Sequence, residues 1–205
     1  MIRRYHPDKV PQILYPACDV KNFVAKQDFT MTLGELLGRE DVVSEGDHLS
    51  GKTLIVTSLN RYERKKNINL ALESFAKYIK MVGASKRSLL VIAGGYDERL
   101  IENVEHHLEL VNLANQLNIM DRVVFLRSIS NDQRILLLQK TDILLYTPAN
   151  EHFGIVPCEG MYLGCVVLAC DSGGPLESIV NGKTGFLLRP KATLWAEQML
   201  KITTS

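Results

Sequence analysis

The chain has 205 residues, of which 46% are hydrophobic and 23% charged, a balance typical of soluble globular proteins that excludes disordered and collagen-like chains. Its 24 Lys and Arg residues against 23 Asp and Glu residues leave a formal charge of +1, so the charge gives no support for a nucleic-acid partner. The longest apolar runs, such as Val166–Ala169, have the length of strands, whereas a membrane-spanning helix needs about 20 apolar residues. We therefore expect no transmembrane segment in this chain.

The first 50 residues differ in pattern from the rest of the chain. Ile13-Leu14-Tyr15 could form one strand, but residues 35–50 are polar. We expect residues 1–50 to be a connector and residues 51–205 to form the folded domain.

From Gly51 onward, short runs rich in β-branched residues alternate with amphipathic helical stretches. Six continuously apolar runs are predicted as strands: Leu54–Leu59, Leu89–Ala93, Val123–Leu126, Ile143–Tyr146, Val166–Cys170 and Gly185–Leu188. Such runs are typical of parallel strands that are covered on both faces. Repeated βα units imply right-handed crossovers, so the predicted fold class is α/β, with a Rossmann-like doubly wound parallel sheet.

Helices are predicted between these strands from helical spacing and capping residues. Asn67 is a plausible N-cap for a helix over Asn67–Val82, and Ser130-Asn131-Asp132-Gln133 has capping-box spacing before a helix through Lys140. Pro175 suits the first turn of a short helix that Asn181-Gly182 can end. In the helix predicted over Asp97–Leu117, the apolar residues at helical spacing are Ile101, Val104, Leu108 and Val111.

One motif matches a known pattern in the wrong context. The run from Gly46 to Thr53 has the letters of the G-x-x-x-x-G-K-T phosphate-binding loop, but such a loop must follow a strand and open a helix. Here a polar segment precedes it and the β-branched run Leu54-Ile55-Val56-Thr57 follows. Gly94-Gly95 does not complete a dinucleotide fingerprint either. Both observations argue against an NTPase or a dehydrogenase.

A cluster of cations follows the first predicted strand, in Asn60-Arg61-Tyr62-Glu63-Arg64-Lys65-Lys66-Asn67. It lies at the carboxyl edge of the predicted sheet, where doubly wound folds bind ligands. Four cations at that place can hold a diphosphate, or they can form a solvated charge cluster. Composition alone leaves both interpretations open.

Two carboxylates follow the fourth predicted strand, in Asn150-Glu151-His152-Phe153-Gly154-Ile155-Val156-Pro157-Cys158-Glu159. Pro157 suits the first turn of a helix, which puts Glu151 in the loop and Glu159 one turn inside the helix. A ligand at the helix N-terminus can touch both, and the free N–H groups of residues 154–156 would point at an anion. The alternative is two exposed glutamates and a His-Phe pair in the core.

Together these motifs resemble the family 4 retaining glycosyltransferases of the GT-B fold. Glu151 and Glu159 match the family's Glu-x7-Glu pattern, Arg61-x4-Lys66 matches its phosphate-contacting pair, and Ser172-Gly173-Gly174-Pro175-Leu176-Glu177 matches its Gly-rich loop. The stretches NRYERKKNINLALE, AGGYDER, EHFGIVPCE and SGGPLESI are similar to mannosyltransferases that build the dolichol-linked oligosaccharide. The similarity runs from about Ile13 to about Pro190, and it departs from the usual family residues at Cys158, Gly160 and Val166.

The resemblance implies a role for each matched residue. Glu151 would be the catalytic residue and would hold the mannose, while Glu159 would accept hydrogen bonds from the ribose hydroxyls. Guanine would lie near the loop Arg127-Ser128-Ile129. The implied donor-binding residues are Arg61, Lys66, Arg127, Ser128, Ile129, His152, Phe153, Gly154, Ile155, Val156 and Glu159. Arg64 and Lys65 are expected to be solvated and replaceable.

The resemblance also implies substrates and partners. The reaction would transfer mannose, with retention, from GDP-mannose to a dolichyl-diphosphate-linked oligosaccharide, in α-1,3 and α-1,6 linkage, during N-glycan precursor synthesis on the cytosolic face of the endoplasmic reticulum. Residues 51–205 would be the donor domain, incomplete at its C-terminus. Residues 1–50 would be the connector and remnant of a missing N-terminal acceptor domain, so the chain alone would bind donor without transferring it. Alternatives are a truncated, non-catalytic nucleotide-sugar-binding module and a sugar-nucleotide epimerase of the same fold.

Neither a metal nor a cofactor is expected. The chain has no Asp-x-Asp, so charge on a diphosphate would be neutralised by Arg61, Lys66 and the helix N-terminus near residues 154–156. The four cysteines, Cys18, Cys158, Cys165 and Cys170, form no C-x-x-C pair, which favours reduced, partly buried thiols.

Overall fold

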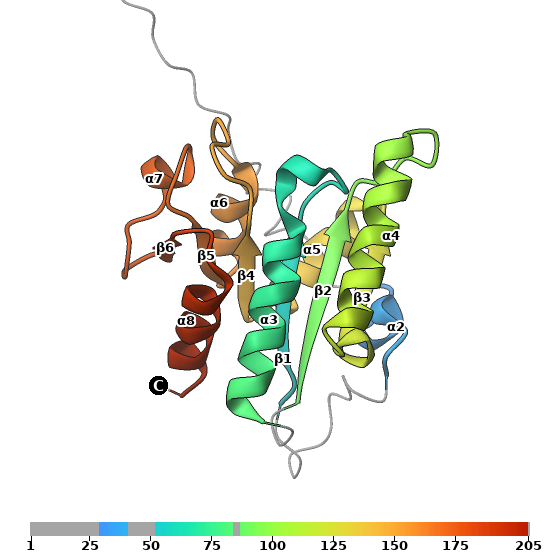
Figure 1. Ribbon diagram of the computed structural model, residues 1–205, viewed down its shortest axis with the longest axis horizontal. Coiled ribbons are helices and arrows are strands. Elements are labelled where there is room, and N and C mark those ends of the chain that lie inside the picture. The colour runs from blue at the N-terminus through green and yellow to red at the C-terminus, as the bar shows by residue number, and fades with distance from the viewer. Residues whose placement is uncertain (1–28, 41–51, 84–86, 205) are drawn as a thin grey trace, which may run out of the picture.

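A computed structural model describes residues 29–40, 52–83 and 87–204 of the chain. Its six strands form one parallel sheet in the order β3-β2-β1-β4-β5-β6 (Figure 1). The strands are β1 (Leu54–Leu59), β2 (Ser88–Gly94), β3 (Val123–Arg127), β4 (Ile143–Tyr146), β5 (Val166–Cys170) and β6 (Phe186–Leu188). The bounds of β1, β4 and β5 are the predicted ones, whereas β3 and β6 differ by one residue at one end and β2 by one residue at each end. The predicted fold class is confirmed.

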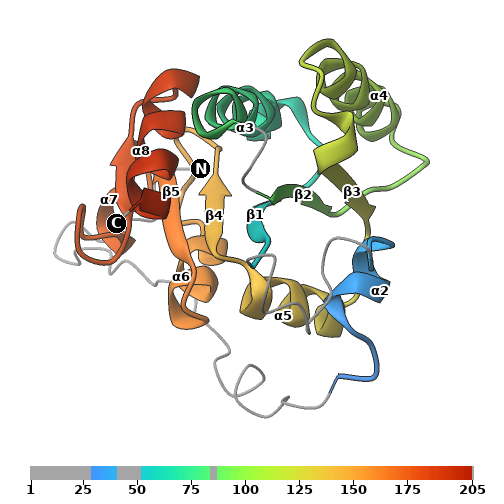
Figure 2. The ribbon, with the colours of Figure 1, turned by 90° about the horizontal axis from the view of Figure 1, so that it is seen from below.

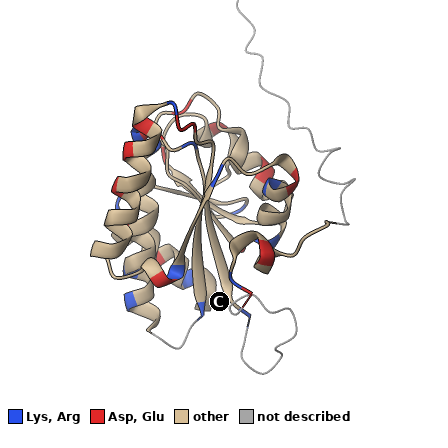
Figure 3. Cartoon of the chain, turned by 90° about the vertical axis from the view of Figure 1, so that its right-hand side faces the viewer, with Lys and Arg blue, Asp and Glu red and all other residues tan. Residues whose placement is uncertain are grey.

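Helices cover both faces of the sheet (Figure 2). One layer contains α3 (Ile68–Val82), α4 (Ile101–Gln116) and α8 (Ala192–Thr204), and the other contains α2 (Leu33–Leu37), α5 (Asn131–Lys140) and α6 (Ile155–Tyr162). Alternate residues of a strand face opposite layers: Val56 packs with α3 and α8, whereas Ile55 and Leu59 pack with α2 and α5. The strands are mostly apolar, as expected where both faces of a sheet are covered, although Thr57 and Ser58 of β1 and Ser88 of β2 are buried polar residues. Accordingly, the charged residues lie mainly on the helices and loops around the strands (Figure 3).

The strand order reverses between β1 and β4. β2 and β3 follow β1 to one side of the sheet, and β4, β5 and β6 extend it to the other. β1 and β4 pair through Val56 with Ile143 and Thr57 with Leu144. In doubly wound sheets, the crevice at the carboxyl ends of the two strands at such a reversal is the ligand site. The cation cluster follows β1 and the two-glutamate motif follows β4, so the fold brings both motifs to this crevice.

Asn67 is the N-cap residue of α3, as predicted, but its side chain makes no capping bond. Its backbone is left-handed (φ 51°), because Asn67 also ends the short 3₁₀ turn η1 (Arg64–Lys66) by donating its N–H to the Arg64 carbonyl at 3.0 Å. The signal predicted for the end of the short helix at Pro175 is wrong in detail. The helix α7 (Pro175–Ser178) does begin at Pro175. It ends before Asn181-Gly182, because Gly182 instead bonds the Gly185 carbonyl in the turn that leads to β6. The capping box at Ser130 and Gln133 is confirmed.

The predicted apolar face of α4 is also wrong. Ile101 and Leu108 are 74% and 56% exposed. The face that packs on the sheet carries Asn103, His106, Leu110 and Ala114. Asn103 fixes this orientation, because its side chain donates to the Tyr62 carbonyl at 3.0 Å and accepts from the Asp97 N–H at 3.0 Å. Specific polar contacts therefore decide which face of α4 is buried.

The region read as a connector contains a helix in its described part. α2 begins with a capping box between Thr32 and Glu35, and Leu33, Leu36 and Leu37 are buried among residues of the sheet. This five-residue helix is too short for its periodicity to stand out in the sequence. The strand expected at Ile13–Tyr15 lies outside the described residues, and the boundary at residue 51 stays a prediction.

The phosphate-loop match lies partly outside the described residues, which include only its last two positions. Lys52 pairs with Asp142 at 2.7 Å, just before β4, and Thr53 leads directly into β1. Both therefore lie at the amino edge of the sheet, opposite the carboxyl ends of β1 and β4. The strand after Thr53 takes the place of the helix that a phosphate-binding loop requires.

The cysteine thiols in the described part of the chain are free. Burial raises the pKa of Cys165 to about 12 and that of Cys170 to about 11, while Cys158 is half-buried. Cys18 lies outside the described residues. Of the helices in the described ranges, none has the length and hydrophobicity that a membrane crossing requires.

Candidate functional site

The loop after β1 is anchored by a buried tyrosine. The Tyr62 hydroxyl donates to the carbonyls of Ile92 and Leu126, both at 3.1 Å, and its ring is fully buried. Burial raises the pKa of the Tyr62 phenol far above its usual value, so the hydroxyl stays protonated as a donor. The neighbouring Arg61 points outward, with its side chain 63% exposed and ion-paired to Glu63 at 2.9 Å.

Lys66, the second predicted phosphate-binding residue, is in a different environment. Its side chain is only 10% exposed, and its ammonium lies 2.6 Å from Oε1 of Glu151. The Thr147 hydroxyl donates to the Lys66 carbonyl at 2.7 Å. These two bonds cross the crevice from the β1 side to the β4 side, so the structure brings together Lys66 and Glu151, which the sequence separates by 85 positions.

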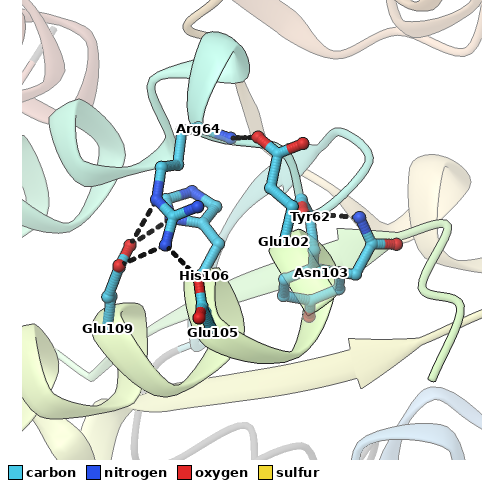
Figure 4. Close-up of polar contacts among 7 residues, drawn as sticks. All are labelled: Tyr62, Arg64, Glu102, Asn103, Glu105, His106 and Glu109. Carbon is cyan, nitrogen blue, oxygen red and sulfur yellow. Dashed lines mark hydrogen bonds and ion pairs between the residues drawn. The ribbon is translucent and has the colours of Figure 1, made fainter. Parts of the chain in front are cut away.

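Arg64 is exposed, as expected, but it also ties this loop to α4 (Figure 4), and whether it is replaceable stays a prediction. Its guanidinium binds Glu109 through two bonds of 2.6 and 3.3 Å and Glu105 through one of 2.9 Å. Its backbone N–H donates to Glu102 at 3.2 Å. A bidentate pair within a network holds geometry better than an isolated surface pair does. Lys65 remains exposed and contacts Glu63 at 3.2 Å.

The charge network around Arg64 shifts the pKa of one of its carboxyl groups. Arg64, and to a lesser degree His106, lower the pKa of Glu109 from its usual value to about 2. The carboxylate therefore stays charged throughout the physiological pH range. Together with the bond from Asn103 to the Tyr62 carbonyl, this network fixes the backbone that carries Arg61 and Lys66.

The Gly-rich loop after β5 positions the loop that carries Glu151. The Gly174 N–H donates to the Glu151 carbonyl at 2.7 Å, and a Cβ atom at Gly174 would lie only 2.1 Å from the Phe153 carbonyl oxygen. Gly154 has a left-handed conformation (φ 77°), and a Cβ there would lie 2.7 Å from the Tyr146 hydroxyl. Only glycine allows both approaches. Burial, and then the nearby Glu151 carboxylate, raise the pKa of Tyr146 far above its usual value.

Glu159 is placed as predicted, inside α6. It is nearly buried, with 5% of its side chain exposed, and Nη1 of Arg134 lies 2.5 Å from its Oε2 atom. The alternative of two exposed glutamates is therefore wrong for Glu159. Arg134 belongs to α5 and was missed in the sequence, because no spacing rule connects residues of two different helices.

The residues between the two glutamates open α6. Gly154 precedes the helix without a side-chain cap, and Ile155 and Val156 are half-buried in its first turn. Phe153 is half-buried, and His152 is exposed. A His-Phe pair in the core, the other part of that alternative, is therefore not what the structure has.

The predicted base-binding loop lies at the same edge, beyond β2. The Arg127 guanidinium lies over the Tyr96 ring at 4.9 Å, and the Ser128 hydroxyl donates to the Tyr96 carbonyl at 2.6 Å. Ile129 packs partly into the core layer that contains α5. Burial, followed by the charge of Arg127, lowers the pKa of His107, whose ring contacts Tyr96. This loop is two strands away from the Lys66–Glu151 pair.

Two cations follow β1 at this edge of the sheet, the exposed Arg61 and the nearly buried Lys66. Lys66 reaches Glu151 in the loop that leads to α6, and that helix begins at Gly154 without a side-chain cap. Within the described ranges, no group of three or more His, Cys, Asp or Glu side chains is placed to hold a metal ion.

The fold and this crevice define a class of protein, and comparison with known families agrees. The family model described as "Glycosyl transferases group 1" matches residues 44–205. The chain therefore belongs to this glycosyltransferase family.

Particular relatives are more informative. The chain is 44% identical over 193 residues to "Alpha-1,3/1,6-mannosyltransferase ALG2" of Homo sapiens, covering 93% of this chain and 43% of that protein. It is 40% identical over 204 residues to the protein of the same name in Dictyostelium discoideum, covering 96% of this chain and 48% of the relative. The chain thus spans slightly less than half the length of these curated relatives.

Solved structures support the fold. HepE of Anabaena, solved in complex with UDP and glucose, is 21% identical with a TM-score of 0.64 and covers 85% of this chain and 43% of its own. A glycosyltransferase from Rickettsia africae is 20% identical with a TM-score of 0.67 and covers the same shares. At these identities the likeness concerns the Rossmann-like domain alone.

Removing the two partners of the Lys66–Glu151 pair should cost different amounts of stability. Glu151→Ala leaves a nearly buried ammonium without its counter-charge, and we expect the free energy of unfolding to fall by about 1–3 kcal/mol. Lys66→Met fills the same space with an apolar chain and leaves a more exposed carboxylate, so we expect a loss below about 1 kcal/mol. Urea unfolding followed by circular dichroism measures both, and equal losses would contradict the asymmetric burial of the pair.

Proposed function

We propose that this chain carries the donor-binding domain of a retaining mannosyltransferase that transfers mannose from GDP-mannose to a dolichyl-diphosphate-linked oligosaccharide, in α-1,3 and α-1,6 linkage. The observation that carries the proposal is the Lys66–Glu151 pair at the carboxyl ends of β1 and β4. It brings together the lysine that would bind the phosphate and the glutamate that would bind the sugar. The 44% identity to the human mannosyltransferase supports the choice of sugar and acceptor. On the same similarity, the protein would also have a separate acceptor domain and would act on the cytosolic face of the endoplasmic reticulum.

The central chemical demand is stabilisation of the departing nucleoside diphosphate. As the bond between the mannose anomeric carbon and the diphosphate breaks, negative charge grows on the phosphate oxygens. Arg61, Lys66 and the first N–H groups of α6 would bind these oxygens. Hydrogen bonds to charged groups contribute roughly 1.5–3 kcal/mol each, against roughly 0.3–1 kcal/mol for an exposed helix dipole. The two cations would therefore contribute most.

The carboxylates would hold the rest of the donor. Glu151, with the backbone around Phe153-Gly154, would bind the mannose hydroxyls, and Glu159 would bind the ribose hydroxyls. By the family resemblance, guanine would lie near Arg127-Ser128-Ile129. This loop lies at the same edge of the sheet as Lys66 and Glu151, which is compatible with that placement.

Retention would follow from attack on the same face from which the diphosphate leaves. The acceptor hydroxyl oxygen forms the new bond to the anomeric carbon as the bond to the diphosphate oxygen breaks. The hydroxyl proton passes to the departing phosphate oxygen. In this scheme no separate side-chain base is needed, and Glu151 orients the sugar beside the reacting carbon.

A transfer assay tests the function as a whole. The chain joined to an N-terminal acceptor domain should move radiolabelled mannose from GDP-mannose to a lipid-linked acceptor. Incubation with GDP-mannose alone should give no epimerised sugar nucleotide. Conversion of GDP-mannose without acceptor would favour the epimerase alternative, and donor binding without transfer would favour a binding module.

Arg61 and Lys66 should both be needed for diphosphate binding. We expect Arg61→Ala and Lys66→Met each to weaken GDP binding by roughly 10-fold to 150-fold at low salt, the equivalent of one charge-assisted bond. Isothermal titration calorimetry with GDP measures this, with Lys65→Ala as the matched cation control from the same loop. The proposal fails here if both single variants bind GDP as tightly as the parent chain.

The two glutamates should act on different parts of the donor. Glu159→Gln should weaken binding of GDP and of GDP-mannose alike, because the ribose loses a charge-assisted hydrogen bond. Glu151→Gln should leave GDP binding within about 3-fold, below the roughly 10-fold effect of a lost charge-assisted bond, and should reduce the affinity for GDP-mannose. Calorimetry with both ligands separates these effects, and an equal effect of the two changes on GDP affinity would contradict this division.

A further inference from the structure

Glu159 is a nearly buried carboxylate that is held by a cation from another helix. Its Oε2 atom lies 2.5 Å from Nη1 of Arg134, and the side chains of Glu159 and Arg134 are 5% and 28% exposed. Taking a carboxylate out of water is unfavourable unless a counter-charge and hydrogen bonds replace the lost hydration. Arg134 supplies both.

Arg134 is itself held in place. Its Nη2 atom donates to the Asn131 side chain at 2.9 Å. The first turn of α5 that carries it is fixed by the reciprocal capping bonds of Ser130 and Gln133. The guanidinium therefore has a defined position from which to orient the carboxylate on α6.

The contact leaves one oxygen of Glu159 available. Oε2 is used by Arg134, whereas Oε1 accepts no hydrogen bond from any residue that the structure describes. We propose that Arg134 is a positioning residue for nucleotide recognition, which holds the Glu159 carboxylate so that Oε1 accepts a hydrogen bond from a ribose hydroxyl of the donor. This inference rests on the proposed function, because that function places the ribose at Glu159.

A positioning role differs from a structural tie between α5 and α6 in one measurable respect. If Arg134 only held the helices together, its loss would weaken the binding of every nucleotide by the same factor. If it orients the ribose-binding oxygen, its loss removes the ability to distinguish a ribose from a sugar without hydroxyls. The ratio of two affinities separates these roles even when the overall affinity falls.

The experiment measures binding of GDP and of 2′,3′-dideoxy-GDP by calorimetry to the same chain. The parent chain should prefer GDP by about 10-fold or more, as expected for one charge-assisted hydrogen bond. Arg134→Ala should reduce this preference to about 3-fold or less, and Arg134→Lys, which keeps the charge with a single donor group, should fall between them. Lys140→Ala, a cation removed from the last turn of the same helix, is the matched control and should keep the parent's preference.

A double variant guards against misfolding through an unpaired buried charge. Arg134→Ala with Glu159→Gln leaves a neutral site, and it should lose no more preference for GDP than Glu159→Gln alone. Additive losses, or an unchanged preference in Arg134→Ala, would overturn the positioning role. A parent chain that binds GDP without preferring it to the dideoxy compound would overturn it too, because the ribose contact would be absent. A parent chain that binds no GDP would instead refute the proposed function.

Discussion

The ion pair between Lys66 and Glu151 is the interaction on which the arrangement of the site depends. It joins the two loops that leave β1 and β4 where the strand order reverses. The ammonium is nearly buried, so its charge must be compensated by a partner at fixed distance, and Glu151 is the carboxylate in place to do so. The Thr147 hydroxyl, directly after β4, donates to the Lys66 carbonyl and so holds the loop after β1 against the end of β4. In the proposed function, the same geometry that satisfies this charge would also present a cation and a carboxylate to the donor.

Each of these loops is in turn positioned from outside the crevice. The loop after β1 is held by the buried Tyr62 and by the bonds of Arg64 to α4. The loop after β4 is held by Gly174, where backbone meets backbone too closely for any side chain. Pre-positioned groups stabilise developing charge without a reorganisation cost at the moment of reaction. In the proposed function, the supporting residues would therefore contribute to the chemistry without touching the substrate.

The strands and the approximate place of the site could be predicted from the sequence, whereas the contacts between elements could not. Continuous apolar runs are a strong signal because a parallel sheet buries both faces, and each strand was found within one residue. The face of α4 was predicted wrongly because Asn103 pairs with the Tyr62 carbonyl in a distant loop and with the Asp97 N–H just before the helix, while Leu108 is left exposed. Arg134 was missed for the same reason, since its partner Glu159 lies on another helix. Periodicity reports which residues are apolar, but it does not report partners that only the tertiary fold brings together.

The described ion pairs also suggest how the proposed site avoids holding its product too tightly. Arg61 pairs with Glu63, and Lys66 pairs with Glu151. A diphosphate entering the crevice therefore competes with carboxylates for these cations instead of neutralising free charges, so only part of each new bond appears as affinity. Once the sugar has left, the carboxylates can regain their partners, which favours release of the nucleoside diphosphate. For an enzyme that must discharge a highly charged leaving group after every transfer, paired cations suit turnover better than unpaired ones, because binding energy that persists in the product complex slows the next cycle.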